Sequence, residues 1–320
     1  MSTRLRRTTA RRASTTRPRI GITLGDCAGI GPEIVEFALK SGGVPDSTEY
    51  VILGRQPNCK PGVPTPETAR AAATALEEAV TLARRGELDG IVTGPVHKAR
   101  MYEVGFRFPG QTEFFAERCG VKNFAMCLTG GKLTVALVTA HIPLRKVPRA
   151  LKRSEIMRIG LLLAEFLRSR GKHAARVAVA GLNPHAGESG KLGLEEIEVI
   201  APAIEDLNSS LGSGLRRGNA ANADDSPRLF IGPVSPDTVF NRAVEGEFDA
   251  VLCMYHDQAL IPLKLHAFHS GVNMTLGLPF PRTSPDHGTA FEIAGKSIAR
   301  PDSMIAAINL AVELAHKTSR

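Results

Sequence analysis

The chain has 320 residues, of which 43% are hydrophobic, 22% charged and 5% aromatic, with no tryptophan. This composition is ordinary for a globular protein, and the length predicts one large or two modest domains. No apolar stretch approaches the roughly 20 residues that span a bilayer, and the few aromatic residues argue against a nucleic-acid surface built on base stacking.

The net charge of +8 is concentrated at the N-terminus. Without the arginines that precede the first acidic residue, Asp26, the remaining chain has a net charge of +1; they are Arg4, Arg6, Arg7, Arg11, Arg12, Arg17 and Arg19. We therefore predict neither a nucleic-acid nor a membrane partner. Residues 1–18 are rich in Ser, Thr and Arg, which predicts a disordered basic tail, with an organellar transit peptide as the alternative.

The cysteines are odd in number, scattered and without a CxxC pair; they are Cys27, Cys59, Cys119, Cys127 and Cys253. This pattern is typical of reduced thiols in a cytoplasmic protein.

Short apolar runs alternate with helical patterns along the chain. Strands are predicted at Ile20–Leu24, Tyr50–Leu53, Gly90–Thr93, Phe124–Leu128, Leu133–Thr139, Arg176–Ala180, Leu229–Gly232, Ala250–Met254 and Val272–Leu276. Helices are predicted at Pro66–Arg85, Ser154–Arg170, Leu194–Leu207 and Ser303–His316. This alternation indicates an α/β fold with a largely parallel sheet covered by helices.

Several local signals refine this pattern. The Thr129–Lys132 segment between two strands predicts a hairpin, so the sheet is expected to be mixed. Ser154 suits a helix N-cap and Gly171 a helix end. The segment Leu211–Ser226 is rich in Gly, Asn and Ser, which predicts an exposed loop.

The segment Gly25–Glu33 lies between a predicted strand and a predicted helix. It superficially resembles a dinucleotide-binding turn, but Ile34 occupies the third glycine position, so the fingerprint fails. Pro32 suits the first helical position. A tight strand-to-helix turn without a ligand explains the pattern equally well.

Three histidines each follow a predicted strand: His141, His185 and His256. A single histidine usually has a structural role. Three at equivalent strand ends can converge, because ligands bind at the carboxyl ends of strands in open α/β sheets. Neutral imidazoles suit a divalent metal, and three protein ligands leave coordination positions open for catalysis. We expect zinc, with cobalt or magnesium as alternatives.

Two carboxylates accompany these histidines. Asp257 follows His256 directly, and Asp237 lies in the Ser235–Thr238 segment. Either carboxylate can orient a ligating imidazole. For Asp237, a helix N-cap is the alternative.

A cationic and polar group follows His256: Lys264, Asn273 and Arg282. Arg282 lies in the Pro279–Ser284 segment, which we interpret as a loop. Arginine forks and lysine point charges usually hold phosphate or carboxylate. Individually these are more often surface residues, but together with the histidines they favour an anionic substrate beside a metal.

The segment Asp286–Lys296 combines small residues with a histidine. Small residues allow a flat ligand to approach the backbone closely. A loop capping the last helix is an equally good interpretation.

From Ile20 to about Ala315 the chain resembles the 4-hydroxythreonine-4-phosphate dehydrogenase family of pyridoxine (vitamin B6) biosynthesis. The matching segments are GDCAGIGPE, TGPVHKA, GQTEFFAE, TAHIPL, GLNPHAGE, GPVSPDT, MYHDQALIPLK and GVNMTLGLPFPRTSPDHGTAFEIAG.

The resemblance implies a two-domain fold like that of isocitrate and isopropylmalate dehydrogenases, with mixed, mainly parallel sheets and the active site in the interdomain cleft. The cofactor-side domain would comprise residues 19–125 and 275–320, and residues 126–274 would form the central domain with the dimer interface and the metal ligands. It also implies a homodimer with shared active sites, in which the partner supplies His256. NAD or NADP would bind at His287, Gly288, Thr289 and Ala290.

By the same resemblance, the metal ligands are His141, His185 and His256. The substrate contacts are Gln111, Thr112, Lys264, Asn273 and Arg282, and the active-site carboxylates are Asp237 and Asp257. Family members usually have a histidine where this chain has Gln111. Glutamine keeps the hydrogen bonding but cannot carry charge.

The implied reaction oxidises 4-phosphooxy-L-threonine to 2-amino-3-oxo-4-phosphooxybutanoate, which decarboxylates to 3-amino-2-oxopropyl phosphate. Lys264 and a metal-linked water are both candidate bases. The alternatives are a sister dehydrogenase of phosphorylated threonate or erythronate or of an aromatic cis-dihydrodiol dicarboxylate, a binding protein without turnover, and a nucleic-acid binder acting through the tail.

Overall fold

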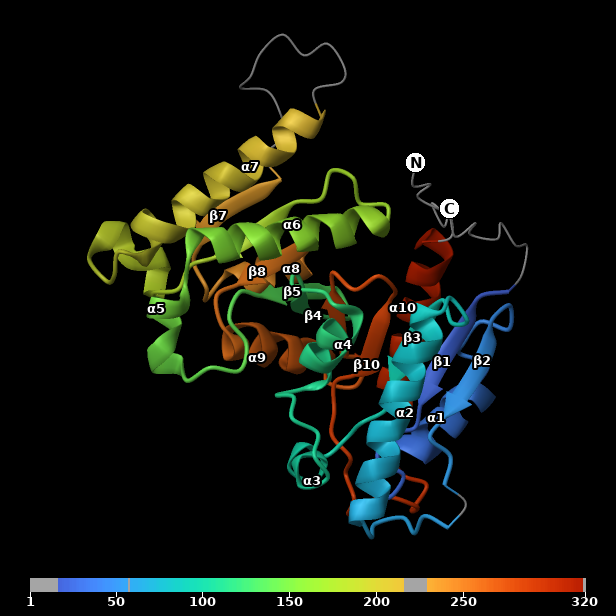
Figure 1. Cartoon of the computed structure of the whole chain (residues 1–320). Coiled ribbons are helices and arrows are strands. Elements are labelled where there is room, and N and C mark those ends of the chain that lie inside the picture. The colour runs from blue at the N-terminus through green and yellow to red at the C-terminus, as the bar shows by residue number, and fades with distance from the viewer. Residues whose placement is uncertain (1–16, 57, 216–228, 319–320) are drawn as a thin grey trace, which may run out of the picture.

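The computed structural model describes residues 17–56, 58–215 and 229–318. It contains a ten-stranded sheet with helices on both faces (Figure 1). Most of the predicted tail lies outside the described residues, which begin at Arg17. No helix within the described ranges combines the length and apolarity needed to cross a membrane.

The sheet has the strand order β2-β1-β3-β10-β9-β4-β5-β8-β6-β7. The strands are β1 (Arg19–Thr23), β2 (Glu49–Leu53), β3 (Gly90–Thr93), β4 (Ala125–Gly130), β5 (Leu133–Leu137), β6 (Val177–Ala180), β7 (Phe230–Val234), β8 (Ala250–Cys253), β9 (Val272–Leu276) and β10 (Arg282–Pro285). Two parallel groups, β2-β1-β3-β10 and β5-β8-β6-β7, flank the antiparallel pairings of β9 and β4. The predicted mixed sheet and the β4–β5 hairpin are confirmed.

The interpretation of Pro279–Ser284 as a loop is wrong for its last residues, because Arg282 begins β10. Thr283 pairs with Val92 on one side and with Met274 on the other. The strand is short and polar, so its sequence lacks the apolar alternation that marks the other strands.

The helices are α1 (Gly31–Lys40), α2 (Pro66–Arg84), α3 (Lys98–Glu103), α4 (Gln111–Cys119), α5 (Val147–Ala150), α6 (Arg153–Ser169), α7 (Ala201–Leu215), α8 (Val239–Val244), α9 (His256–Ala267) and α10 (Asp302–Thr318), with short turns at Leu144–Lys146, Pro184–Gly190 and Glu196–Ile200. The predicted N-cap is wrong, because Lys152 precedes α6 and Ser154 lies inside it. Gly171 follows that helix with a φ of 83°, as a helix-ending glycine does. Helix α7 continues to Leu215, so the loop predicted from Leu211 is wrong there, and residues 216–226 lie outside the described ranges.

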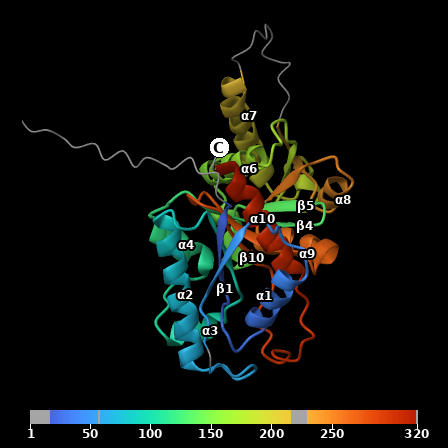
Figure 2. The same ribbon diagram turned by 90° about the vertical axis from the view of Figure 1, so that its right-hand side faces the viewer.

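Three hydrophobic clusters join the helices to the sheet. Val92 belongs to the cluster that includes α1, α6, α7 and α10, whereas its neighbour Ile91 packs with α2 and α4. Successive side chains of a strand point to opposite faces. The helices therefore cover both faces of the sheet, which Figure 2 shows from the side.

The turn between β1 and α1 packs against the loop that follows β10. The Ile30 amide donates to the Thr289 carbonyl at 2.9 Å. A Cβ atom on Gly29 would lie 2.7 Å from that same carbonyl oxygen, so only glycine allows this approach. Pro32 occupies the second helical position rather than the predicted first, because α1 begins at Gly31.

We expect Gly29→Ala to lower the free energy of unfolding by about 1–3 kcal/mol, because its methyl group must displace backbone. Gly288→Ala is the matched control, since its Cβ atom would meet nothing within 4 Å. Thermal unfolding followed by circular dichroism measures both. Equal melting temperatures for Gly29→Ala and the wild type would contradict the packing.

The expectation that all five cysteines are reduced is wrong for two of them. A disulfide joins Cys27, in the β1–α1 turn, to Cys59, in the loop after β2. Their Cα atoms lie 6.1 Å apart, although 32 positions separate them in the chain, so their spacing gave no signal. Cys119, Cys127 and Cys253 are free thiols, and burial raises the pKa of Cys127 to about 12.

Candidate active site

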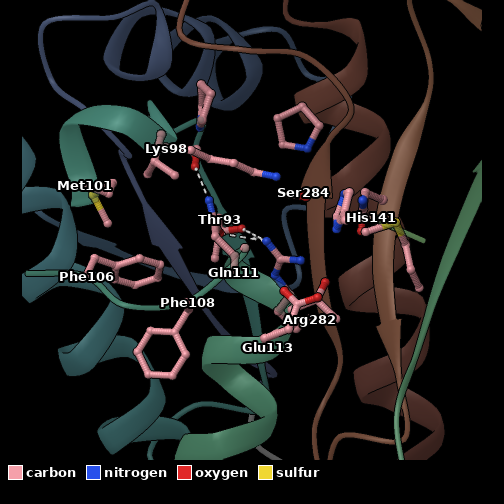
Figure 3. A pocket seen from close by; sticks show the side chains of 18 of the residues that line it. Thr93, Lys98, Met101, Phe106, Phe108, Gln111, Glu113, His141, Arg282 and Ser284 are labelled. Atoms are coloured by element: carbon pink, nitrogen blue, oxygen red, sulfur yellow. Dashed lines mark hydrogen bonds between the residues drawn. The ribbon is translucent and has the colours of Figure 1, made fainter. Parts of the chain in front are cut away.

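A cavity of about 200 Å³ opens between segments that the fold brings together from distant parts of the chain. Its walls come from the loop after β3, helices α3 and α4, strands β4, β9 and β10, and the residues that follow β5 and β10. Figure 3 shows apolar side chains, including Met101, Phe106 and Phe108, on one side of it and polar side chains on the other. Such a concave, partly apolar space suits a small ligand.

Arg282 is the central cation of the cavity wall and is only 3% exposed. Its Nη2 donates to Thr93 Oγ1 at 2.6 Å and to Gln111 Oε1 at 2.7 Å, whereas its buried Nε has no partner among the described residues. Burial lowers the pKa of Arg282 to about 10, with Glu113 opposing that shift. The guanidinium therefore remains charged near neutral pH and keeps one donor free.

Gln111 and Thr112 begin α4 and line the same cavity. Gln111 Nε2 donates to the Gly94 carbonyl at 3.3 Å while its Oε1 accepts from Arg282. Thr112 Oγ1 lies 3.2 Å from Thr275 Oγ1. The Gln111 amide thus orients Arg282 without adding a charge.

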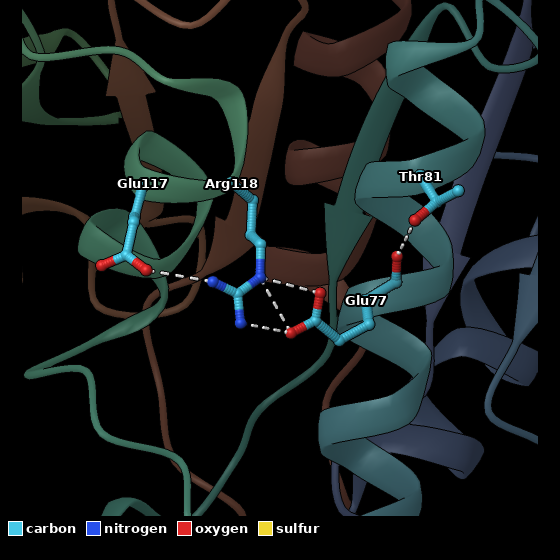
Figure 4. A network of polar contacts seen from close by, with 4 residues as sticks. All are labelled: Glu77, Thr81, Glu117 and Arg118. Atoms are coloured by element: carbon cyan, nitrogen blue, oxygen red, sulfur yellow. Dashed lines mark hydrogen bonds and ion pairs between the residues drawn. The ribbon is translucent and has the colours of Figure 1, made fainter.

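Helix α4 is fixed by a polar network outside the cavity (Figure 4). Arg118 binds both carboxylate oxygens of Glu77 in α2, with distances of 2.7–2.9 Å, and also pairs with Glu117. Its guanidinium lies 5.2 Å from the ring centroid of Phe114. A two-pronged ion pair of this kind restricts the helix more than a single contact would.

The other two predicted substrate contacts differ in their placement. Asn273 lines the cavity, and its buried Oδ1 has no partner in the described part of the chain. Lys264 is not among the lining residues, and its Nζ pairs with the Asp286 carboxylate at 2.9 Å and donates to the Asp286 carbonyl. Asp286 directly precedes His287, which does line the cavity.

Two of the three predicted metal ligands lie together. The ring centroids of His141 and His256 are 5.7 Å apart, and His141 lines the cavity. Asp257 Oδ1 lies 2.9 Å from His256 Nδ1, so this carboxylate can orient the imidazole as carboxylates commonly do behind ligating histidines. Burial, and then Lys98, lowers the pKa of His141. A neutral imidazole is the form that binds metals.

His185 does not join this pair within the single chain. The described residues contain no group of three His, Cys, Asp or Glu side chains that could hold a metal. His185 lies in the Pro184–Gly190 segment, where it has a φ of 50° and begins a left-handed stretch. Asp237 precedes α8 without capping it, and the hydrogen bond from Ser235 lowers the pKa of its carboxyl. His185 lowers that pKa to a smaller extent.

The predicted cofactor residues form the loop after β10. Burial lowers the pKa of His287, which favours the uncharged ring. A Cβ atom on Gly288 would meet nothing within 4 Å, so the space beside this backbone is open. Thr289 is buried, and Ala290 adopts a φ of 42°. Of these four residues, only His287 lines the cavity.

Sequence reasoning missed two charged residues of the cavity wall, Lys98 and Glu113. Both lie in segments that carry the family resemblance, TGPVHKA and GQTEFFAE. Their position in those segments was the available signal, but nothing in the spacing distinguishes a cavity-facing charge from a surface charge.

The comparisons with known proteins agree with one another. A model of the family described as pyridoxal phosphate biosynthetic protein PdxA matches residues 30–311. A protein of Caulobacter vibrioides named 4-hydroxythreonine-4-phosphate dehydrogenase is 41% identical over 94% of this chain and 98% of its own. One of Erythrobacter litoralis with the same name is 42% identical over 92% of this chain and 96% of its own.

The fold is also that of a solved structure. The crystal structure of 4-hydroxythreonine-4-phosphate dehydrogenase from Klebsiella pneumoniae covers 93% of this chain and 99% of its own, with a TM-score of 0.74 and 34% identity.

Proposed function

Because this chain belongs to the PdxA family, whose members are oxidoreductases, we propose that it oxidises 4-phosphooxy-L-threonine at its secondary alcohol. The product, 2-amino-3-oxo-4-phosphooxybutanoate, loses carbon dioxide to give 3-amino-2-oxopropyl phosphate for pyridoxal phosphate biosynthesis. The observation that carries this proposal is the cavity whose lining includes Gln111, Thr112, Asn273 and Arg282. These are four of the five side chains expected to contact the substrate.

The proposed phosphate position is at Arg282, because its buried Nε is a donor without a partner. An anionic oxygen would satisfy that donor with a charge-assisted hydrogen bond. Lys98 adds a second cation and has no ion pair among the described residues, and Figure 3 shows its side chain reaching over the cavity. Lys264 would act from behind, by holding Asp286 and thereby the backbone at His287.

The nicotinamide cofactor, NAD or NADP, is proposed to bind along His287, Gly288, Thr289 and Ala290. The open space beside Gly288 supports a close approach of the cofactor to the backbone. His287, which lines the cavity, would contact the cofactor from the cavity wall. The β1–α1 turn supports this loop from behind through the Ile30–Thr289 hydrogen bond.

A divalent metal fits the His141 and His256 pair, because the rings are adjacent and Asp257 orients one of them. We propose His185 as the third ligand, with zinc as the ion. When bound, the metal would lower the pKa of the substrate hydroxyl and stabilise negative charge on its oxygen. In the single chain His256 already lies beside His141, and a homodimer is the assembly in which we expect all three imidazoles to converge.

The test is cofactor reduction, measured as absorbance of the reduced nicotinamide, with purified protein, several divalent metals and three substrates. We expect turnover with 4-phosphooxy-L-threonine above that with phosphorylated erythronate or an aromatic cis-dihydrodiol dicarboxylate. A higher kcat/KM with either alternative would replace the proposed substrate. Protein lacking residues 1–18 should retain the dehydrogenase activity. A nucleic-acid binder, in contrast, would lose its function with the arginines of that segment. The cytoplasmic location remains a prediction from the sequence.

A further inference from the structure

One carboxylate lines a cavity whose Lys and Arg side chains, Lys98 and Arg282, are cations. Among the described residues of its wall, Glu113 is the only acidic one, and it faces the same space as Lys98 and Arg282. It opposes the lowering of the Arg282 pKa by burial, and both side chains line the same cavity. Figure 3 shows Glu113 beside Arg282 in the cavity wall.

The fold does not account for this carboxylate. Glu113 Oε2 is buried and has no hydrogen-bond partner, and neither oxygen forms an ion pair within the described ranges. Arg282 directs its Nη2 to Thr93 and Gln111 instead. A buried carboxylate oxygen without a donor costs free energy, so such an atom is expected to receive its donor from a ligand.

We infer that Glu113 recognises the ammonium group of the substrate and thereby selects an amino acid over the corresponding hydroxy acid. This inference rests on the proposed function and adds the specificity-determining residue for it. The substrate would be bound as a dipolar molecule, with its phosphate toward Arg282 and its ammonium toward Glu113. An ammonium has three donors and a positive charge, which match an unpaired carboxylate.

The unpaired carboxylate also gives a reason why the site would bind the amino acid more tightly than the hydroxy acid. A hydroxyl group in place of the ammonium would donate one neutral hydrogen bond and would bring no positive charge to Glu113. Sites built around a buried charged or polar group reject ligands that fail to pair it. Without Glu113, the charged residues Lys98 and Arg282 would favour phosphorylated erythronate or threonate, which carry two anionic groups and no cation.

The experiment measures Kd by calorimetry for two probes, 4-phosphooxy-L-threonine and 4-phosphoerythronate, with wild-type protein and Glu113→Gln. We expect Glu113→Gln to weaken binding of the amino acid by roughly ten- to a hundredfold, since charge-assisted hydrogen bonds have this magnitude. Binding of the hydroxy acid should change by less than about threefold or become tighter. Glutamine has nearly the same shape as glutamate, so the packing of α4 is retained.

Glu117→Gln is the matched control, because Glu117 lies on the same helix and its side chain is 66% exposed beside Arg118. It should leave both Kd values unchanged. Equal losses for the two probes in Glu113→Gln would show a purely structural role in the first turn of α4 and would overturn the inference. If Glu113→Gln fails to fold, the two Kd values of the wild-type protein decide the matter. Equal affinity for both probes would also overturn the inference. Tight binding of the amino acid without cofactor reduction would instead refute the proposed function and leave the inference standing.

Discussion

Replacing Arg282 with alanine is expected to lower kcat/KM for the phosphorylated substrate by roughly a hundredfold or more. The side chain is 3% exposed, so its removal deletes a buried cation and leaves Thr93 and Gln111 without their donor. Hydrogen bonds to charged groups contribute about 1.5–3 kcal/mol each, and the proposed phosphate contact would be lost together with the orientation of Gln111.

Arg282→Lys should also reduce kcat/KM, because a point charge cannot bind Thr93, Gln111 and the substrate at once. Values of kcat/KM for phosphorylated and unphosphorylated substrates separate the phosphate contact of Arg282 from its structural role in the wall. The loss should be much smaller with the unphosphorylated analogue. If Arg282→Ala loses the same factor with both, the guanidinium supports the wall and the phosphate lies elsewhere.

The cavity shows why sequence reasoning located its residues but not their arrangement. Arg282 was singled out for its charge in an unusual segment, but its segment was interpreted as a loop because a strand of four residues containing proline lacks apolar alternation. Its burial against Thr93, 189 positions away in the chain, depends on the pairing of β10 with β3. Such a contact is set by the sheet order, which no local pattern contains.

The histidines illustrate the same limit. Strands β5, β8 and β6 are adjacent and parallel, so the expectation that His141, His256 and His185 follow one edge of the sheet was correct. Their position along one edge of the sheet did not by itself bring the three histidine side chains together. His185 lies in backbone with positive φ, a conformation that non-glycine residues rarely adopt and that periodicity does not reveal.

Hydrogen bonds to Glu196 hold the backbone that leads into the Pro184–Gly190 segment. Glu196 is 3% exposed, and one of its oxygens accepts from the amides of Leu182 and Asn183, both at 2.7 Å. Its other oxygen accepts from Asn183 Nδ2 at 2.9 Å. These bonds fix the backbone just before His185, so the position of His185 is set within the fold of the single chain. A second copy of the chain, rather than local rearrangement, is therefore the simpler route to a three-histidine site.

Single alanine substitutions at His141, His185 and His256 are expected to abolish turnover, with a loss of about a thousandfold or more, and to reduce bound metal. A ligand lost from a three-histidine site removes both affinity and charge stabilisation at the reacting oxygen. Metal content by elemental analysis and cofactor reduction are the two measurements. His173→Ala is the matched control, because His173 is exposed and lies outside the cavity wall. Retained metal and activity in any two of the three variants would contradict the shared site.

Mixing two inactive variants tests whether His141 and His256 of one site come from different protomers. If His256 of one chain completes the site of the other, a heterodimer of His141→Ala and His256→Ala protomers contains one site with both histidines intact. With random exchange, about a quarter of the wild-type activity should return, since half of the dimers are mixed and each has one working site. If His141 and His256 act within one chain, as their 5.7 Å ring separation allows, every site lacks a ligand and the mixture stays inactive. The same mixture should also bind metal in proportion to its activity, because one complete ligand set is what both require.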